Sequence, residues 1–263
     1  MKHCILILIF FGTTGFAGLN TQSAPDHKAY TSGEWFQMRI HYGLINAGMA
    51  ELEVREAIKN NKKVYHAIGK GYTTGMTKFF FKVEDDYQSY IDKETGVPYH
   101  FIRKIDEGGY TKDQEGFFDH DKKSVLVKDH KKKTEKVFPI TENIQDILST
   151  FYYLRNNPKI NTLKVGESIE IDMFFDDEVY KFKLKYTGKE DLKTKFGVVP
   201  TMVFKPYVQS GRVFKEQESL TVWISDDKNR LPIRIKASLA VGSLKAEIEK
   251  FKGLKHPFTV KHK

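Results

Sequence analysis

Few residues of this chain are spaced for covalent catalysis. A serine nucleophile of the α/β-hydrolase type lies in a Gly-x-Ser-x-Gly turn. The nearest match is Gly166-Glu167-Ser168-Ile169-Glu170, which lacks the final glycine and falls in a predicted strand. The only cysteine, Cys4, lies close to the N-terminus. The sequence therefore predicts neither a serine nor a thiol mechanism.

One local cluster carries residue types that bind metal ions. Asp119-His120-Asp121 faces Asp129-His130 across a predicted hairpin, and carboxylate and imidazole groups are ligands for hard or borderline cations. Adjacent residues of a strand point to opposite faces, so Asp119 and His120 can share one ion only where the backbone turns. We expect a polar turn here, with no metal site and no cofactor.

Acidic residues also occur in adjacent groups, which are Glu84-Asp85-Asp86, Asp176-Asp177-Glu178 and Asp226-Asp227. A glycoside hydrolase needs two carboxyl groups roughly 5 to 10 Å apart across a cleft. Adjacent acids between strands are more often turn residues. A hydrolase of cell wall or glycan therefore stands as an alternative function.

Aromatic residues are numerous for so polar a chain, with 20 Phe, 13 Tyr and 2 Trp. The runs Phe79-Phe80-Phe81, Phe117-Phe118 and Phe174-Phe175 place aromatic rings on both faces of their segments. One face can fill a core, while the other needs a cover. A helix, a second sheet, a partner or a bound acyl chain could supply it.

The elements that must position these residues are mainly strands. Apolar and polar residues alternate in period two over 34–42, 49–55, 179–186, 220–224 and 233–239, with turn residues between the runs. Residues 144–155 instead have helical spacing, and Asn143 is the expected N-cap. The sequence predicts a mainly β fold, an antiparallel meander forming curved sheets or an open barrel, with one central amphipathic helix packed on the sheet.

The segments on either side of this helix resemble each other. Gly33-Glu34 and Gly166-Glu167 each precede a strand, and a proline follows at a similar distance, at Pro98 and Pro232. We hypothesise an internal duplication with halves 33–140 and 166–254 joined by the helix 144–155. Two alternating meanders can also align by chance. Without a Pro/Gly/Ser-rich linker, residues 18–263 are expected to form a single domain.

The N-terminal residues have the order of a secretion signal. Lys2 and His3 precede a short apolar run, and Gly15 and Ala17 fit the small-x-small cleavage pattern. We expect residues 1–17 to be a removed signal peptide and the mature protein to be periplasmic. Cys4 lies inside the signal, so the mature chain is expected to be soluble rather than lipidated, without a transmembrane segment.

The formal net charge of +9 favours anionic partners, which in an envelope compartment are lipids or wall polymers rather than nucleic acid. Seven of the residues from 122 to 136 are lysines. They are typical of a solvated hairpin whose edge is protected from aggregation. An anionic lipid headgroup is the alternative partner for them.

Three stretches read together carry a family resemblance. They are Gly33 to Gly48, Asp146-Ile147-Leu148-Ser149-Thr150-Phe151-Tyr152-Tyr153-Leu154-Arg155, and Val222 to Asp227 with Leu231-Pro232. The chain resembles the exported bacterial family known as domain of unknown function 3108 (DUF3108). That resemblance implies no reaction and no functional residues.

A fainter similarity is to the periplasmic lipoprotein carriers, in which a concave sheet closed by a helix holds acyl chains. The shared parts include the hairpin from Asp226 to Leu231 before Pro232. Such a likeness concerns the fold and does not fix function.

These observations favour a non-catalytic envelope protein that holds a lipidic or amphipathic ligand between the curved sheet and the helix. The candidate ligand-binding residues are Phe79, Phe80, Tyr152 and Tyr153. A hydrolase and a protein-interaction scaffold are the alternatives. The sequence leaves open the ligand's identity and the oligomeric state.

Overall fold

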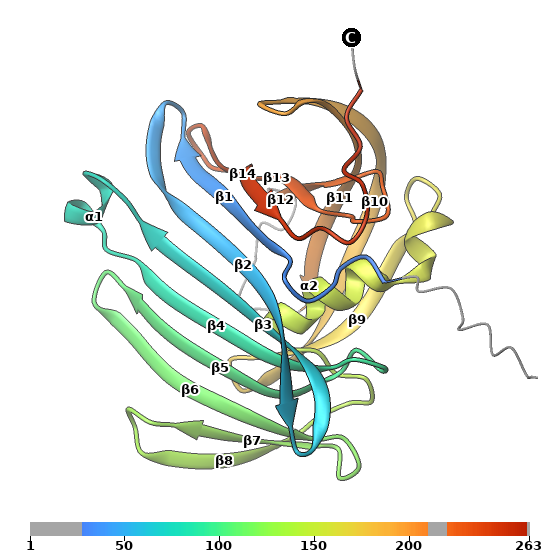
Figure 1. Cartoon of the computed structure of the whole chain (residues 1–263). Helices are drawn as coiled ribbons and strands as arrows, with labels where there is room; N and C mark the ends of the chain where they lie inside the picture. Colours follow the sequence, from blue (N-terminus) through green and yellow to red (C-terminus); the bar gives the residue numbers. More distant parts are fainter. Residues whose placement is uncertain (1–27, 210–219, 262–263) are drawn as a thin grey trace, which may run out of the picture.

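Fourteen antiparallel strands form one continuous sheet in the computed structural model, which describes residues 28–209 and 220–261 (Figure 1). The predicted signal peptide, residues 1–17, lies outside the described residues. The spatial order is β8-β7-β6-β5-β4-β3-β2-β1-β14-β13-β12-β11-β10-β9. The strands are β1 Trp35–Tyr42, β2 Ile45–Lys59, β3 Lys62–Thr73, β4 Glu84–Asp92, β5 Pro98–Glu107, β6 Tyr110–Asp119, β7 Ser124–Asp129, β8 Thr134–Pro139, β9 Ser168–Phe175, β10 Glu178–Thr194, β11 Gly197–Gln209, β12 Leu220–Ser225, β13 Pro232–Ser238 and β14 Ser243–Lys252.

The alternation of residues along the strands determines which face of the sheet is buried. In β1, Phe36 and Met38 are buried in the core, whereas Gln37 between them is only half-buried. The prediction of a mainly β, antiparallel, curved meander with one central helix is confirmed.

The sheet curls until its two edge strands approach each other, although β8 and β9 are not neighbours in the hydrogen-bonded order. Phe174 of β9 packs against Phe138 of β8, with ring centres 5.8 Å apart, and against Phe118 of β6. Gln145, just before the central helix, forms a parallel bridge with Met173 of β9. The segment between the halves therefore covers the seam of an open barrel.

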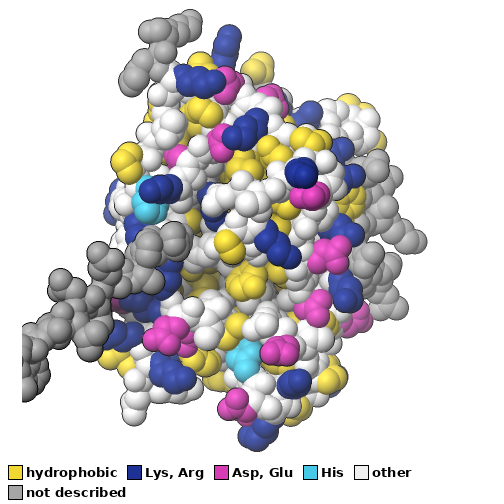
Figure 2. Space-filling view, turned by 90° about the vertical axis from the view of Figure 1, so that its right-hand side faces the viewer, with side chains coloured by type: hydrophobic (Ala, Val, Ile, Leu, Met, Phe, Trp, Pro, Cys, Tyr) yellow, Lys and Arg dark blue, Asp and Glu magenta, His cyan; other side chains and the backbone are white. Residues whose placement is uncertain are grey.

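The lysine-rich residues 122–136 lie at the β8 edge. Lys131, Lys132 and Lys133 are exposed in the turn between β7 and β8, and most of β8 is exposed. Lysines beside an exposed edge strand discourage pairing with another chain. On the face that Figure 2 shows, basic and acidic side chains are interspersed, so the positive excess is not gathered there.

The central helix α2 comprises Ile147–Asn156, three residues later at its start than predicted. Asp146, not Asn143, is the N-cap: its carboxylate accepts from the Ser149 backbone N–H at 2.8 Å, and the Ser149 hydroxyl accepts from the Asp146 N–H. Asn143 has a positive φ of 57°, a turn conformation that asparagine tolerates. Both residue types can cap a helix, so the sequence alone favoured the wrong one.

Two shorter helices complete the described chain, α1 (Thr77–Phe80) and the 3₁₀ helix η1 (Pro158–Asn161). Among residues 28–209 and 220–261, every helix is too short or too polar to cross a bilayer.

The strands of the two halves begin at similar intervals. β9 begins 133 residues after β1, and β14 begins 133 residues after β6. Among the described residues, the hairpin β7–β8 has no counterpart after β14. Residues 210–219, which align with the α1 region when the halves are compared, lie outside the described chain. The duplication stays a prediction.

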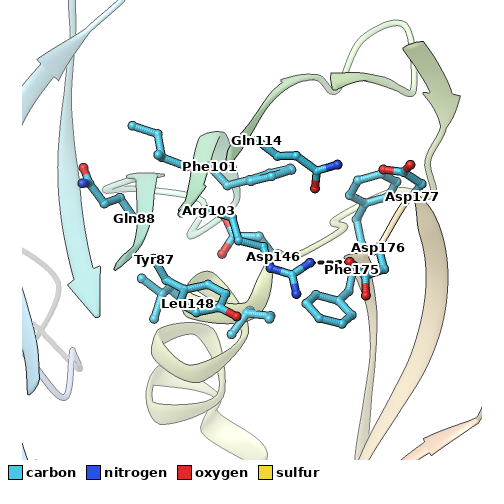
Figure 3. Close-up of a pocket in the computed structure, with 13 residues that line it drawn as sticks. Tyr87, Gln88, Phe101, Arg103, Gln114, Asp146, Leu148, Phe175, Asp176 and Asp177 are labelled. Carbon is cyan, nitrogen blue, oxygen red and sulfur yellow. Dashed lines mark hydrogen bonds and ion pairs between the residues drawn. The ribbon is translucent and has the colours of Figure 1, made fainter. Parts of the chain in front are cut away.

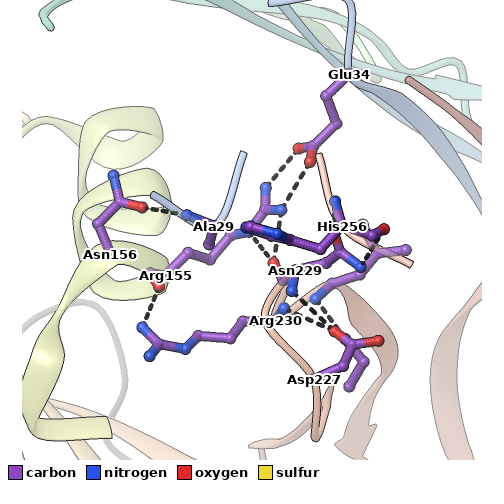
Figure 4. A network of polar contacts seen from close by, with 10 residues as sticks. Ala29, Glu34, Arg155, Asn156, Asp227, Asn229, Arg230 and His256 are labelled. Atoms are coloured by element: carbon purple, nitrogen blue, oxygen red, sulfur yellow. Dashed lines mark hydrogen bonds and ion pairs between the residues drawn. The ribbon is translucent and has the colours of Figure 1, made fainter. Parts of the chain in front are cut away.

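A buried network fixes the end of α2 to both ends of the described chain (Figure 4). The Arg155 guanidinium binds the Glu34 carboxylate through two bonds, of 2.5 and 2.8 Å, and donates twice more to the Asn229 carbonyl. Arg230 donates to the Arg155 carbonyl, and Asn229 exchanges hydrogen bonds with His256. The helix, the start of β1, the β12–β13 turn and the C-terminal segment are thereby held together.

Glu34→Gln should lower the free energy of unfolding by about 3–5 kcal/mol, because it leaves the Arg155 charge buried without its carboxylate. Urea unfolding followed by circular dichroism measures the loss. Glu53 is the matched control, since it also binds an arginine, Arg55, through two bonds of 2.8 and 2.7 Å, but at the surface. Glu53→Gln should have a much smaller effect. Equal losses would contradict the importance of the buried pair.

Candidate functional site

An apolar cavity of about 400 Å³ lies between α2 and the C-terminal half of the sheet. Its walls come from α2, from the following η1 helix and from strands β9 to β13. The lining side chains are almost all apolar: Ile147, Thr150, Phe151, Leu154, Arg155, Ile160, Met173, Phe175, Tyr180, Phe182, Leu184, Pro206, Leu220, Val222, Ile224, Pro232 and Ile235.

The helix divides the interior of the curved sheet. Leu148 and Tyr152 pack into a solid cluster with Val54 and Ala67 of the N-terminal half. Gly69 of β3 allows this approach, since a Cβ atom there would lie 3.0 Å from the Leu148 side chain. The opposite side of α2, with Ile147 and Leu154, faces the cavity. The helix therefore packs on both halves, through Leu148 and Tyr152 on one and Leu154 on the other, and the cavity lies beside the second contact.

Among the described residues, Arg155 and Thr150 are the polar side chains other than tyrosine that line the cavity. Arg155 is fully engaged by Glu34 and Asn229. The Thr150 hydroxyl is buried and has no hydrogen-bond partner within the described chain. A buried hydroxyl without a partner costs free energy.

A smaller pocket of about 30 Å³ adjoins the cavity at the start of α2, sharing Ile147 and Phe175 with it (Figure 3). Arg103 projects into this region, ion-paired with Asp176, and its guanidinium carbon lies 4.2 Å from the Phe175 ring centre. Its Nε is buried without a partner among the described residues. The pocket has room for about one water molecule.

Two carboxyl groups near this pocket have raised pKa values. Burial raises the pKa of Asp146 to about 6, against the effect of hydrogen bonds from Ser149 and from the Ser89 hydroxyl at 2.6 Å. Burial and the neighbouring Glu107 raise the pKa of Asp85 to about 6. Asp146 is occupied as a helix cap, so its titration affects stability directly.

The adjacent acids predicted from the sequence have structural partners. Asp176 is paired with Arg103 and Lys112. Asp226 is paired with Lys189, and Asp227 accepts hydrogen bonds within its own turn.

The residues of the proposed metal cluster are also engaged. His120 bonds to the Pro98 carbonyl at 2.7 Å, and His130 bonds to Glu115. Within residues 28–209 and 220–261, no group of three or more His, Cys, Asp and Glu side chains could hold a metal ion.

The four predicted lining residues lie elsewhere. Phe79 and Phe80 lie in α1 at a hairpin tip, 90% and 83% exposed. Tyr152 is buried against Tyr30 and Tyr65, and Tyr153 lies next to Gly96. None of the four lines the cavity, although α2 itself does; their role in ligand binding stays a prediction.

Sequence reasoning missed Tyr180, Phe182 and Leu184, which line the cavity from β10. They alternate with Lys181, Lys183 and Lys185, so the period-two pattern marks them as one apolar face. A solid core would give the same alternation, so the pattern alone does not reveal a cavity.

Comparison with known families identifies the family of this chain. The family model DUF3108, described as a protein of unknown function, matches residues 37–249. The chain belongs to this family. A comparison with curated proteins finds no match.

The three sequence stretches that suggested DUF3108 meet in space. Glu34 and Arg155 belong to the first two stretches, and Asn229 lies between the two parts of the third. These three residues form the core of the buried network (Figure 4). In this DUF3108 chain, the stretches that carry the family resemblance therefore supply contacts that hold α2 in place.

Two solved structures show related architecture. A β-barrel-like protein of domain of unknown function DUF1849 from Brucella abortus has a TM-score of 0.58 at 9% identity, covering 86% of this chain and 99% of that one. This likeness shows the fold alone. A candidate lipoprotein from Parabacteroides distasonis has a TM-score of only 0.39 at 10% identity, covering 86% of this chain and 98% of that one.

Asp146→Asn provides a test of the buried carboxyl group by its pH dependence. Because the folded pKa of about 6 exceeds the unfolded value, the wild type binds a proton more tightly when folded. Its stability relative to Asp146→Asn should rise as pH falls through about 6 toward about 4, by up to about 3 kcal/mol.

Urea unfolding of both proteins across this range measures the difference. Burial lowers the pKa of His66 and His100, but both proteins contain these residues, so their titration cancels. Parallel stability curves would show that Asp146 does not titrate in this range.

Proposed function

We propose that this DUF3108 protein binds a lipidic or amphipathic ligand, with an apolar chain inside the cavity between α2 and β9–β13. The observation that carries the proposal is the volume of about 400 Å³ lined by almost wholly apolar side chains. Binding sites for small molecules typically measure about 300–1,000 Å³ and are lined mainly by apolar groups.

An apolar guest is favoured on physical grounds. Water in such a space finds few hydrogen-bond partners, and an empty space deprives its walls of packing contacts. Each buried CH₂ group of a guest gains about 0.8 kcal/mol from transfer out of water. A single acyl chain therefore suits the cavity.

The charged end of an amphipathic ligand would remain outside the apolar walls. Among the residues that the structure describes, Arg155 is the one cationic side chain lining the cavity, and it is neutralised by Glu34. A second charge placed inside would have no partner, and burying it would be costly. The Thr150 hydroxyl could instead bind one uncharged oxygen of the ligand.

We propose in addition that the protein acts in the periplasm. This part rests on the N-terminal pattern of residues 1–17 and on the net charge of +9. Native mass spectrometry of the protein purified gently from its own envelope, with organic extraction, would identify a bound amphiphile. A ligand-free mass in repeated preparations would contradict the carrier function.

Leu184→Trp should fill the cavity and weaken binding of cis-parinaric acid, a fluorescent fatty acid, by about tenfold or more, equivalent to about 1.4 kcal/mol. A fluorescence titration measures the affinity. Leu126→Trp is the matched control, since Leu126 is also half-buried but lies on β7, away from the cavity. Thermal unfolding checks that both variants fold. Equal binding by both would exclude the cavity as the site.

Thr150→Val should stabilise the ligand-free protein by about 1 kcal/mol, because it removes a buried hydroxyl without a partner. It should also weaken binding of an oxygen-containing ligand. Thr201, whose hydroxyl donates to the Glu190 carbonyl, is the control; Thr201→Val should destabilise. Urea unfolding distinguishes the two. Destabilisation by both would mean that Thr150 has a partner in solution.

A further inference from the structure

Exposed apolar side chains gather on three neighbouring hairpin tips. The β1–β2 tip carries Leu44 and Ile45, α1 in the β3–β4 connection carries Phe79 and Phe80, and the β13–β14 tip carries Val241. We call these five residues the apolar rim. Figure 1 shows α1 and the β1–β2 hairpin at the upper left, with the β13–β14 hairpin beside the latter.

The three tips form one surface. β14, β1, β2, β3 and β4 are consecutive antiparallel neighbours, so the β13–β14, β1–β2 and β3–β4 connections lie at the same end of the strands. The Tyr42 hydroxyl bonds to the Val241 carbonyl at 2.8 Å. Thr77 bonds to the Asn46 carbonyl at 3.1 Å. These contacts join each tip to the next.

Packing within the chain does not explain the composition of the rim. α1 is a single turn with no buried residue and no side-chain cap, so its phenylalanines contribute nothing to a core. A contiguous apolar patch on a protein surface usually marks an interaction site. The rim is therefore suited to contact something outside the chain.

Charge beside the rim indicates an anionic partner. Lys236 of β13 lies directly opposite Lys245 of β14, close to the β13–β14 tip. Like charges directly opposite each other are destabilising, so this pair would be stabilised by a nearby anion. Lys78, within α1 and next to Phe79, is ion-paired with Glu84 at 3.0 Å, so the lysine pair of β13 and β14 carries the charge argument. Apolar and aromatic groups flanked by lysines are typical of proteins that lie on an anionic bilayer.

We propose that the apolar rim docks this protein on the surface of an anionic phospholipid bilayer, with Leu44, Phe79 and Phe80 inserted among the lipids. The rim and its lysines carry this proposal independently of whether the cavity holds a ligand.

Vesicle flotation tests the docking. The probe is a vesicle of one part phosphatidylglycerol to three parts phosphatidylcholine, compared with phosphatidylcholine alone. The full protein should float with the anionic vesicles, and the triple variant Leu44→Ser, Phe79→Ser, Phe80→Ser should bind at least about tenfold more weakly. Lys236→Gln and Lys245→Gln should each reduce binding about fivefold at low salt.

The control is a second triple variant, Ile58→Ser, Val137→Ser, Val165→Ser. These residues are 74%, 67% and 69% exposed but lie away from the rim, so the variant should float like the wild type. Leu184→Trp should also float normally, which separates this proposal from the cavity function. As a second measurement, brominated lipids should quench Phe79→Trp and leave Ile58→Trp unaffected.

Three results would overturn the proposal. The wild type could fail to float with anionic vesicles, or the rim variant could float as well as the wild type. Alternatively, light scattering could show an oligomer that only the rim variant loses, which would make the rim a contact between copies of this chain.

Discussion

The Glu34 to Arg155 ion pair joins the start of the first strand to the central helix, 121 residues away in the sequence. Both side chains are almost completely buried, so each charge depends on the other for compensation. Arg155 lies in the last turn of α2, Glu34 precedes β1, and the Asn229 carbonyl brings in the β12–β13 turn. The position of α2, and with it the shape of the interior, follows from this one arrangement.

The packing of the interior differs between the two sides of α2: one side is solid and the other contains the cavity. Leu148 fits over Gly69, and Tyr152 completes a cluster of aromatic and aliphatic side chains. On the other side of α2, Leu154 joins a cluster that includes Phe182 and Leu184, and the cavity lies beside that contact. The interior is therefore solid beneath Leu148 and Tyr152 and hollow beside Leu154.

The sequence predicted the architecture well because its signals are local. The alternation over residues 34–42 coincides with β1, in which Phe36 and Met38 are buried, and helical spacing located α2 to within a few residues. The site was harder to predict. Phe79 and Phe80 have the composition expected of a cavity wall, but whether an aromatic run faces inward depends on which strands meet when the sheet curls. The pairing of Arg155 with Glu34, on which the helix position depends, joins residues 121 positions apart and has no local pattern.

The pairing of the first strand with the last affects how the protein can be made. β1 is the eighth strand from one edge of the sheet, and on one side it is hydrogen-bonded to β14, where Trp35 lies opposite Lys252. Each half can form hairpins as it is synthesised, but the centre of the sheet can close only after the C-terminal strand is complete. Folding that waits for such long-range contacts is slow. Until then one edge of β1 is unpaired, and an unpaired edge strand is a template for pairing with another chain.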